Sequence, residues 1–231
     1  MDYLDKLLAD YGAVLTDTHL VFTNGDHGSA YINFRVFADK PIILNRFARD
    51  LAKQIFSKGL HTGDPLPIFI GPETLGRDLA RLVALNCHDL VMPGARSQFE
   101  FQSIFPLIED QCGEKVAKFR DNLEFAQHVP GRRFIYVDDI FNNSSTFDAV
   151  KYLIESLGGT IFAACAVVNR QPARNTAEAL GVEHLIALKD VNFESFPPDK
   201  CPLCAANVPM RKSPGHGAAW LAKNPGYPFI E

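Results

Sequence analysis

The sequence predicts an α/β fold with a Rossmann-like open parallel sheet, and three observations support this. Short apolar segments that favour strands alternate with segments of helical periodicity, which is typical of a parallel sheet covered by helices. The length of 231 residues suits one large domain with small additions. A content of 47% apolar and 22% charged residues is typical of globular proteins. We expect an N-terminal helix and hairpin over 1–40, a core over 41–190 and a C-terminal tail over 191–231 that packs on the core.

The N-terminal elements follow from local patterns. Leucines at helical spacing predict an amphipathic helix over residues 2–13. An Asn-Gly-Asp turn between two apolar stretches predicts a strand, a turn and a strand within 19–37. A second apolar helical pattern ends near Gly59, and a short buried strand follows at 66–70.

The middle of the chain is harder to assign. A Gly-Pro turn at 71–76 leads into a helical segment, and Leu90 and Val91 suggest a further strand. Residues 93–132 contain aromatic and aliphatic side chains that fit either strand pieces or a loop packed on itself. A continuous apolar run at 134–137 predicts a buried strand.

The C-terminal part of the core repeats the alternation. We expect a helix over 146–157, a strand over 161–168, a short helix over 174–181 and a last strand over 185–188. The tail after Asp190 is rich in proline and glycine, so we expect a mostly irregular segment.

Charge and cysteine content narrow the function classes. The net charge of −4 argues against nucleic-acid binding, which needs a basic surface. The first residues lack the basic and then apolar order of a secretory signal, and no apolar stretch reaches the roughly 18 residues that span a membrane. Five scattered cysteines fit reduced thiols better than a disulfide framework. We therefore expect a cytoplasmic protein without membrane or nucleic-acid partners.

Two adjacent acids, Asp138 and Asp139, follow the buried strand at 134–137 and precede a polar loop and a helix. Ligands of open α/β sheets bind at this edge, and the free N–H groups of a helix N-terminus favour a phosphate. The acids can accept hydrogen bonds from sugar hydroxyls and can bind hydrated Mg²⁺. The candidate phosphate-binding residues are Asn142, Asn143, Ser144, Ser145 and Thr146.

Residues 134–146 resemble the 5-phosphoribosyl-1-pyrophosphate (PRPP) motif of type I phosphoribosyltransferases. The strand, both acids, the two apolar residues after them and the final Thr146 match that motif. The loop departs from it, because Asn and Ser stand where the family has Thr-Thr-Gly-Gly. The resemblance implies a core of the type I phosphoribosyltransferase kind and a PRPP site. The alternative is a strand that ends in solvated acids followed by an ordinary helix cap.

Residues 19–33 resemble the N-terminal hood segment of orotate phosphoribosyltransferases, which helps to enclose the base. Asn24 and Asp26 replace the usual Ser and basic residue. The resemblance makes Tyr31 a candidate base-binding residue, although a purely structural hairpin fits the same pattern. At the end of the strand over 161–168, Arg170 resembles an arginine that faces the base carboxylate, and the alternative is a surface arginine.

The segment over 71–77 resembles the pyrophosphate loop of the same family. Backbone donors at a turn between a strand and a helix can hold a pyrophosphate. Leu75 stands where the family has a lysine, and Arg77 is close in sequence. The candidate pyrophosphate-binding residues are Thr74, Leu75, Gly76 and Arg77. The alternative is an ordinary connection between a strand and a helix.

The resemblance implies a pentosyltransferase of pyrimidine biosynthesis that joins PRPP to orotate and releases pyrophosphate with the help of Mg²⁺, commonly as a homodimer. Asp138 and Asp139 would hold the ribose and Mg²⁺. The family's catalytic loop is not recognisable, and Lys115, Lys118 and Arg120 are expected to be solvated charges. Two alternatives stay open: a phosphoribosyltransferase for a purine or another base, and a non-catalytic protein that binds PRPP or a nucleotide.

Cys201 and Cys204 form a Cys-x-x-Cys pair, which is half of a zinc site. The tail that holds them resembles that of a divergent branch of orotate phosphoribosyltransferase-like proteins. The chain has no second pair of matching spacing, so the site could be completed only by residues that fold nearby. The candidates are Cys87, His88, Cys112 and His216. The alternative is a pair of packed thiols.

Overall fold

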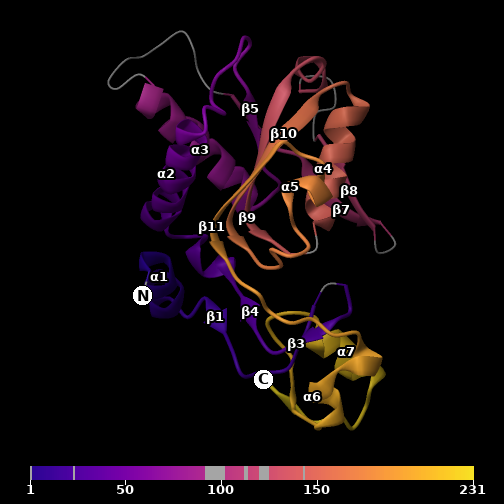
Figure 1. The fold of residues 1–231 in the computed structure, drawn as a ribbon. Coiled ribbons are helices and arrows are strands. Elements are labelled where there is room, and N and C mark those ends of the chain that lie inside the picture. The colour runs from indigo at the N-terminus through magenta and orange to yellow at the C-terminus, as the bar shows by residue number, and fades with distance from the viewer. Residues whose placement is uncertain (1, 23, 92–101, 112–113, 120–124, 143) are drawn as a thin grey trace. The chain divides into compact units, whose positions relative to one another are not determined.

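The structure is a computed structural model that describes residues 2–22, 24–91, 102–111, 114–119, 125–142 and 144–231. It contains two compact units (Figure 1). One consists of Met1–Val36 together with Asn192–Glu231, and the other of Phe37–Val191. The predicted N-terminal hairpin and the C-terminal tail are therefore parts of the same unit.

The larger unit is built on a five-stranded sheet in the order β11-β10-β9-β5-β6, in which each pair of neighbours is parallel. This confirms the predicted open parallel sheet. The register is continuous around the centre, where Val137 of β9 lies opposite Cys165 of β10. The strands are β5 (Ile68–Ile70), β6 (Ser103–Ile104), β9 (Arg133–Phe141), β10 (Thr160–Asn169) and β11 (His184–Asp190).

Helices pack on both sides of this sheet (Figure 1). The helices α2 and α3 pack on each other and on the strands of the sheet, and α4 packs on β10. A hairpin of β7 and β8 packs on α4. The bounds are α2 (Pro41–Ser57), α3 (Leu75–Val91), β7 (Leu107–Gln111), β8 (Glu114–Lys118), α4 (Ser145–Ser156) and α5 (Ala177–Leu180), with short 3-10 helices at Phe34–Phe37 and Ala126–His128.

The core of the larger unit explains why its central strands are continuous apolar runs. Because both faces of a helix-covered sheet are buried, every side chain of such a strand avoids water. In β9, the residues from Phe134 to Val137 are each 0% exposed, and all of β10 after Thr160 is buried. Phe141 and Phe147 pack against Tyr136, so aromatic rings join β9 to the first turn of α4.

One sequence prediction is wrong. Leu90 and Val91 do not form a strand, because α3 continues through both. Both side chains are exposed at the C-terminal end of this helix, so neither belongs to the buried sheet. Within 93–132, the described residues include the short strands β6, β7 and β8, as one of the two interpretations predicted, and a 3-10 helix. Phe99 and Phe101 lie outside the described residues.

The smaller unit combines the two ends of the chain. Short strands pair within it as β1 with β4, β2 with β3 and β12 with β13. The tail is more regular than predicted because it contains two short helices, α6 and α7. The bounds are α1 (Tyr3–Asp10), β1 (Val14–Leu15), β2 (Leu20–Val21), β3 (His27–Gly28), β4 (Tyr31–Ile32), a 3-10 helix at Pro198–Lys200, α6 (Pro202–Ala205), β12 (Met210–Arg211), α7 (Gly217–Lys223) and β13 (Phe229–Ile230).

Among the helices in the described ranges, none has the length and apolar character that a membrane span requires.

Candidate functional site

Asp138 and Asp139 lie near the carboxyl end of β9, the central strand of the sheet. The buried run of β9 stops at Val137, and both acids are half-buried. The carboxyl ends of parallel strands form the edge at which α/β sheets bind ligands. The structure therefore places both predicted acids at the edge where the sequence analysis expects a ligand.

Hydrogen bonds fix the orientation of the two carboxylates. The Tyr136 hydroxyl donates to Oδ2 of Asp138 at 2.6 Å. The backbone N–H of Asp139 donates to Oδ1 of Asp138, and that of Ile140 donates to Oδ1 of Asp139, both at 2.9 Å. Tyr136 and Asp138 point to the same face because side chains alternate along a strand.

The acid pair is electrostatically costly without a ligand. Burial raises the pKa of Asp138, and the hydrogen bond from Tyr136 partly offsets this effect. The pKa of Asp139 is raised well above its ordinary value, first by burial and then by the neighbouring charge of Asp138. A cation or hydroxyl donors beside the pair would favour the charged forms. The site thus suits a ligand that brings hydroxyl groups or Mg²⁺.

Buried polar side chains form hydrogen bonds with the first residue of the loop between β9 and α4. Arg170, at the end of β10, donates from Nη1 to Oδ1 of Asn142 at 2.9 Å. Asn175 donates from Nδ2 to the carbonyl of Asn142 at 2.9 Å and to Oδ1 of Asn169 at 3.1 Å. Arg170, Asn169 and Asn175 are all buried. These contacts fix the start of the predicted phosphate loop, whereas Asn143 lies outside the described residues.

Ser144 caps α4 in a left-handed backbone conformation. Its φ angle is 57°, in the region that glycine enters at low cost and other residues rarely adopt. The Ser144 hydroxyl donates to Oδ2 of Asp148 at 3.2 Å, and the Asp148 N–H donates to the Ser144 carbonyl at 2.8 Å. The helix then begins at Ser145, with Thr146 in its first turn. A serine therefore occupies a backbone geometry that explains the glycine of the resembled motif.

Lys115 adds a positive charge that the sequence analysis did not assign to the site. It lies on β8, and its Nζ donates to the Thr146 hydroxyl at the first turn of α4. Its charge also lowers the pKa of Asp138. Lys115 therefore contacts the end of the predicted phosphate loop, and its charge acts on Asp138. The local sequence around Lys115 carries no sign of this, because it depends on the packing of β8 against α4.

The loop after β5 approaches the same acids. A Cβ atom added to Gly76 would lie 3.0 Å from Oδ1 of Asp138 and 2.6 Å from Cδ of Pro72. A Cβ atom added to Gly71 would lie 2.1 Å from the carbonyl oxygen of Gly76. Both positions therefore need glycine for close approach. The structure brings the predicted pyrophosphate loop and the acid pair together.

The other predicted residues of this loop differ in their surroundings. The Leu75 side chain is buried, while Thr74 is exposed. The peptide bond between Glu73 and Thr74 is cis. Arg77 forms ion pairs with Asp78 at 3.0 Å and with Glu73 at 3.5 Å. A pyrophosphate at Arg77 would have to share it with two carboxylates.

The two predicted base-binding residues belong to different units. Tyr31 is half-buried on β4 of the smaller unit. Arg170 is 2% exposed and holds Asn142 in the larger unit. The roles of both in binding a base stay predictions.

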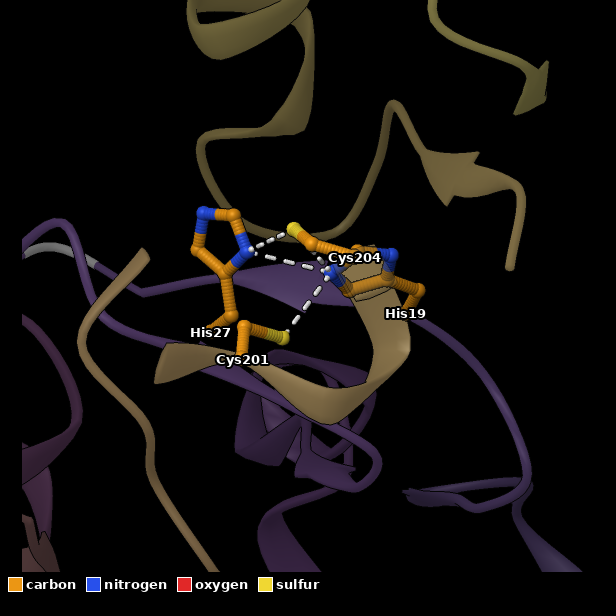
Figure 2. A group of neighbouring side chains, drawn as sticks. All are labelled: His19, His27, Cys201 and Cys204. Atoms are coloured by element: carbon orange, nitrogen blue, oxygen red, sulfur yellow. Dashed lines mark hydrogen bonds between the residues drawn. The ribbon is translucent and has the colours of Figure 1, made fainter. Parts of the chain in front are cut away.

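A second group of side chains lies entirely in the smaller unit. Its members are Cys201 and Cys204 together with His19 and His27 (Figure 2). The two histidines were not predicted from the sequence. Burial lowers the pKa of both imidazoles. The predicted partners Cys87, His88 and His216 are not members of this group, and Cys112 lies outside the described residues.

The fold of the chain is that of phosphoribosyltransferases. The crystal structure of orotate phosphoribosyltransferase from Aeropyrum pernix aligns with a TM-score of 0.54 and 21% identity, over 80% of this chain and 94% of that chain. Adenine phosphoribosyltransferase from Thermoanaerobacter pseudethanolicus aligns with a TM-score of 0.50 and 15% identity, over 71% of this chain and 89% of that chain.

At the sequence level, the chain is similar to orotate phosphoribosyltransferases. It is 25% identical over 223 residues to the orotate phosphoribosyltransferase of Campylobacter curvus. The alignment covers 93% of this chain and 98% of that protein. No family model matches the chain.

Proposed function

We propose that this protein is a phosphoribosyltransferase that transfers the phosphoribosyl group of PRPP to orotate and releases pyrophosphate. One observation carries the proposal: Asp138 of β9 precedes the loop that opens α4 and also closely approaches Gly76, in the first turn of α3. PRPP carries a 5-phosphate and a pyrophosphate on the same ribose. A ribose held by two acids between two loops is the arrangement that such a ligand needs.

Charge and backbone geometry favour a 5-phosphate at the start of α4. A helix N-terminus favours an anion through its free N–H groups and its dipole. In the proposed site the loop 142–146 binds the phosphate, the Thr146 hydroxyl donates to it, and Lys115 neutralises part of its charge. Arg170 and Asn175 hold Asn142, at the start of this loop, by hydrogen bonds.

The ribose and the pyrophosphate lie at the acids in this proposal. Asp138 and Asp139 accept hydrogen bonds from the ribose hydroxyls, which are strong because the acceptors are charged. Thr74, Leu75, Gly76 and Arg77 hold the pyrophosphate in this proposal, through the backbone N–H groups of the first three and the side chain of Arg77. The backbone N–H of Arg77 donates to the Pro72 carbonyl at 2.8 Å. Mg²⁺ fits the same acids, because it prefers carboxylate oxygens and retains several waters. Asp138 and Asp139 would hold the ion, and it would supply positive charge beside the pyrophosphate.

The reaction joins C1 of the ribose to a ring nitrogen of the base as the bond from C1 to the pyrophosphate oxygen breaks. The protein contributes by positioning both substrates and by stabilising charge. Orotate is the proposed base because the similar proteins are named orotate phosphoribosyltransferases. Tyr31 and Arg170 are the proposed base-binding residues. We also propose that the protein is cytoplasmic and forms a homodimer. Sedimentation analysis of the full chain tests the dimer.

The test is turnover. With PRPP, Mg²⁺ and orotate, we expect loss of orotate absorbance with matching release of pyrophosphate, and no turnover without Mg²⁺. Asp138→Asn combined with Asp139→Asn should abolish it. Asp190→Asn, which removes an exposed acid at the end of the neighbouring strand β11, is the matched control and should retain turnover. A parent protein inactive with orotate but active with adenine or another base would refute the choice of orotate.

A second candidate function is the binding of PRPP without turnover. The left-handed Ser144 favours it, because a non-glycine residue in that place restricts the loop. Calorimetry separates the two candidates. Binding of PRPP with Mg²⁺ in a protein that releases no pyrophosphate with any base would establish the second and exclude the first.

A further inference from the structure

Two histidines and two cysteines converge in the smaller unit, and none of them belongs to the proposed PRPP site. His19 directly precedes β2, and His27 is the first residue of β3. Cys201 directly precedes the helical turn α6, and Cys204 lies within it. One donor atom of each residue lies within 4.8 Å of every other (Figure 2). Three of the residues are buried and Cys204 is half-buried. Two imidazoles and two thiols are a common ligand set of structural zinc sites.

The spacing of the donor atoms fits a tetrahedral zinc ion. Nε2 of His19 lies 3.1 Å from Nδ1 of His27 and 3.6 Å from Sγ of Cys201. Sγ of Cys204 lies 3.2 Å from Nδ1 of His27 and 3.7 Å from Nε2 of His19. Ordinary Zn–N and Zn–S bond lengths place tetrahedral ligands about 3.3 to 3.8 Å apart. The cluster therefore needs only small adjustments to hold the ion.

Local structure explains why the four side chains meet. In the antiparallel pair of β2 and β3, Val21 lies opposite His27, and His19 is two residues before Val21. Side chains two residues apart share a face of a strand, so the two histidines are diagonal neighbours. Cys201 and Cys204 are three residues apart in a helical turn, which places them on one face. Each pair thus presents two ligands from one rigid element.

Contacts outside the cluster prepare His19 as a ligand. The carbonyl of Val208 accepts a hydrogen bond at 2.9 Å from Nδ1 of His19, so this nitrogen carries the proton. Nε2 is then left with its lone pair facing the cluster, and such outer hydrogen bonds are typical of zinc-binding histidines. The backbone is held as well, because the Arg211 N–H donates to the His19 carbonyl at 2.7 Å and the His27 N–H donates to the Phe196 carbonyl at 2.8 Å.

We propose that His19, His27, Cys201 and Cys204 bind one zinc ion in a structural site that fastens the C-terminal segment to the N-terminal hairpin. The protein supplies all four ligands, which leaves no open position for a substrate, as in structural zinc sites. The ion links residues more than 170 positions apart in sequence. Such a link stabilises a unit whose strands are two residues long.

Metal content tests the proposal on the full chain, independently of turnover. Protein produced with zinc in the medium and dialysed should contain one zinc per chain by mass spectrometry. Cobalt added to the metal-free protein should give the absorption of a tetrahedral thiolate complex. Cys204→Ser should weaken zinc binding by more than the roughly 10- to 100-fold that loss of an outer hydrogen bond costs. Cys87→Ser, which removes a buried thiol from α3, should leave the zinc content unchanged.

Three results would overturn the proposal. The first is a parent chain that carries no zinc and does not take up zinc or cobalt. The second is a disulfide between Cys201 and Cys204 in protein purified without oxidants. The third is a folded Cys204→Ser chain that retains zinc with parental affinity. Because none of these readouts uses PRPP, failure here leaves the proposed function standing, and failure of turnover leaves the zinc site standing.

Discussion

Asp139 is expected to lower the stability of the folded chain at neutral pH. Its pKa is raised in the folded state, so the fold binds a proton more tightly than the unfolded chain does. Between the ordinary pKa of 3.8 and the raised value, the folded state holds more protons. The free energy of unfolding therefore falls as pH rises through that window, so the destabilisation by Asp139 is absent below the window and complete above it.

We predict that Asp139→Asn stabilises the protein at pH 7 by about 0.5–2 kcal/mol, as removal of a costly functional group commonly does, while it weakens PRPP binding. Urea unfolding across pH 4 to 8 measures the first effect and calorimetry the second. The variant should also lose part of the parental pH dependence. Asp190→Asn is the control, because this exposed acid should change neither quantity. Equal or lower stability of Asp139→Asn at pH 7 would contradict the electrostatic account.

Lys115 should contribute to PRPP affinity through its position beside Thr146. A hydrogen bond between charged groups contributes about 1.5–3 kcal/mol, so Lys115→Gln should weaken binding roughly 10- to 100-fold. Lys118→Gln is the matched control, because Lys118 lies on the same strand but pairs with Glu109 across the hairpin. Calorimetry with PRPP and Mg²⁺ measures both. Similar affinities for the two variants would remove Lys115 from the site.

Residue types and local order predicted part of the candidate site but not its long-range members. Asp138 and Asp139 were evident because they interrupt an apolar strand before a polar loop. Tyr136 could have been found from the alternation of side chains along β9. Lys115 could not, because its contact with Thr146 spans 31 positions. The pairing of His19 with Cys201 spans 182 positions and has no local signal.

At the scale of elements, the connection between β9 and α4 depends on the left-handed Ser144. Ser144→Gly and Ser144→Ala both remove the hydroxyl that donates to Asp148. Glycine adopts a positive φ without the steric cost of a Cβ atom, which is about 1–2 kcal/mol. We therefore predict that the glycine variant is more stable than the alanine variant by about 1 kcal/mol. Urea unfolding compares them directly, and an alanine variant of equal or higher stability would contradict the observed geometry.

Helices and strands were predicted correctly where the sequence shows one clear pattern of apolar residues. The buried strands at 134–137 and 161–168 are continuous apolar runs, and the structure contains both within β9 and β10. Leu90 and Val91 were wrongly predicted as a strand, because two apolar residues fit a strand and an exposed helix end equally well. In the tail, no signal in the sequence marks α6, because a helix of four residues is too short to show helical periodicity.

At the scale of the whole molecule, the order of the sheet brings distant loops to one edge. The strands β5 and β9 are neighbours although about 60 residues separate them, and both are parallel. Their carboxyl ends therefore deliver Gly76 and Asp138 to the same place. Alternation predicted a parallel sheet, but it did not fix the order of the strands. That order turns two separate connections into one candidate site for a ligand with a phosphate at one end and a pyrophosphate at the other.

A crystal structure with PRPP and Mg²⁺ bound tests this claim most directly. The account predicts the 5-phosphate at the backbone N–H groups of residues 142–146, ribose hydroxyls on Asp138 and Asp139, and the pyrophosphate at the Gly76 loop. A ligand bound elsewhere, or loop N–H groups that are fully engaged by the protein in the bound state, would contradict it.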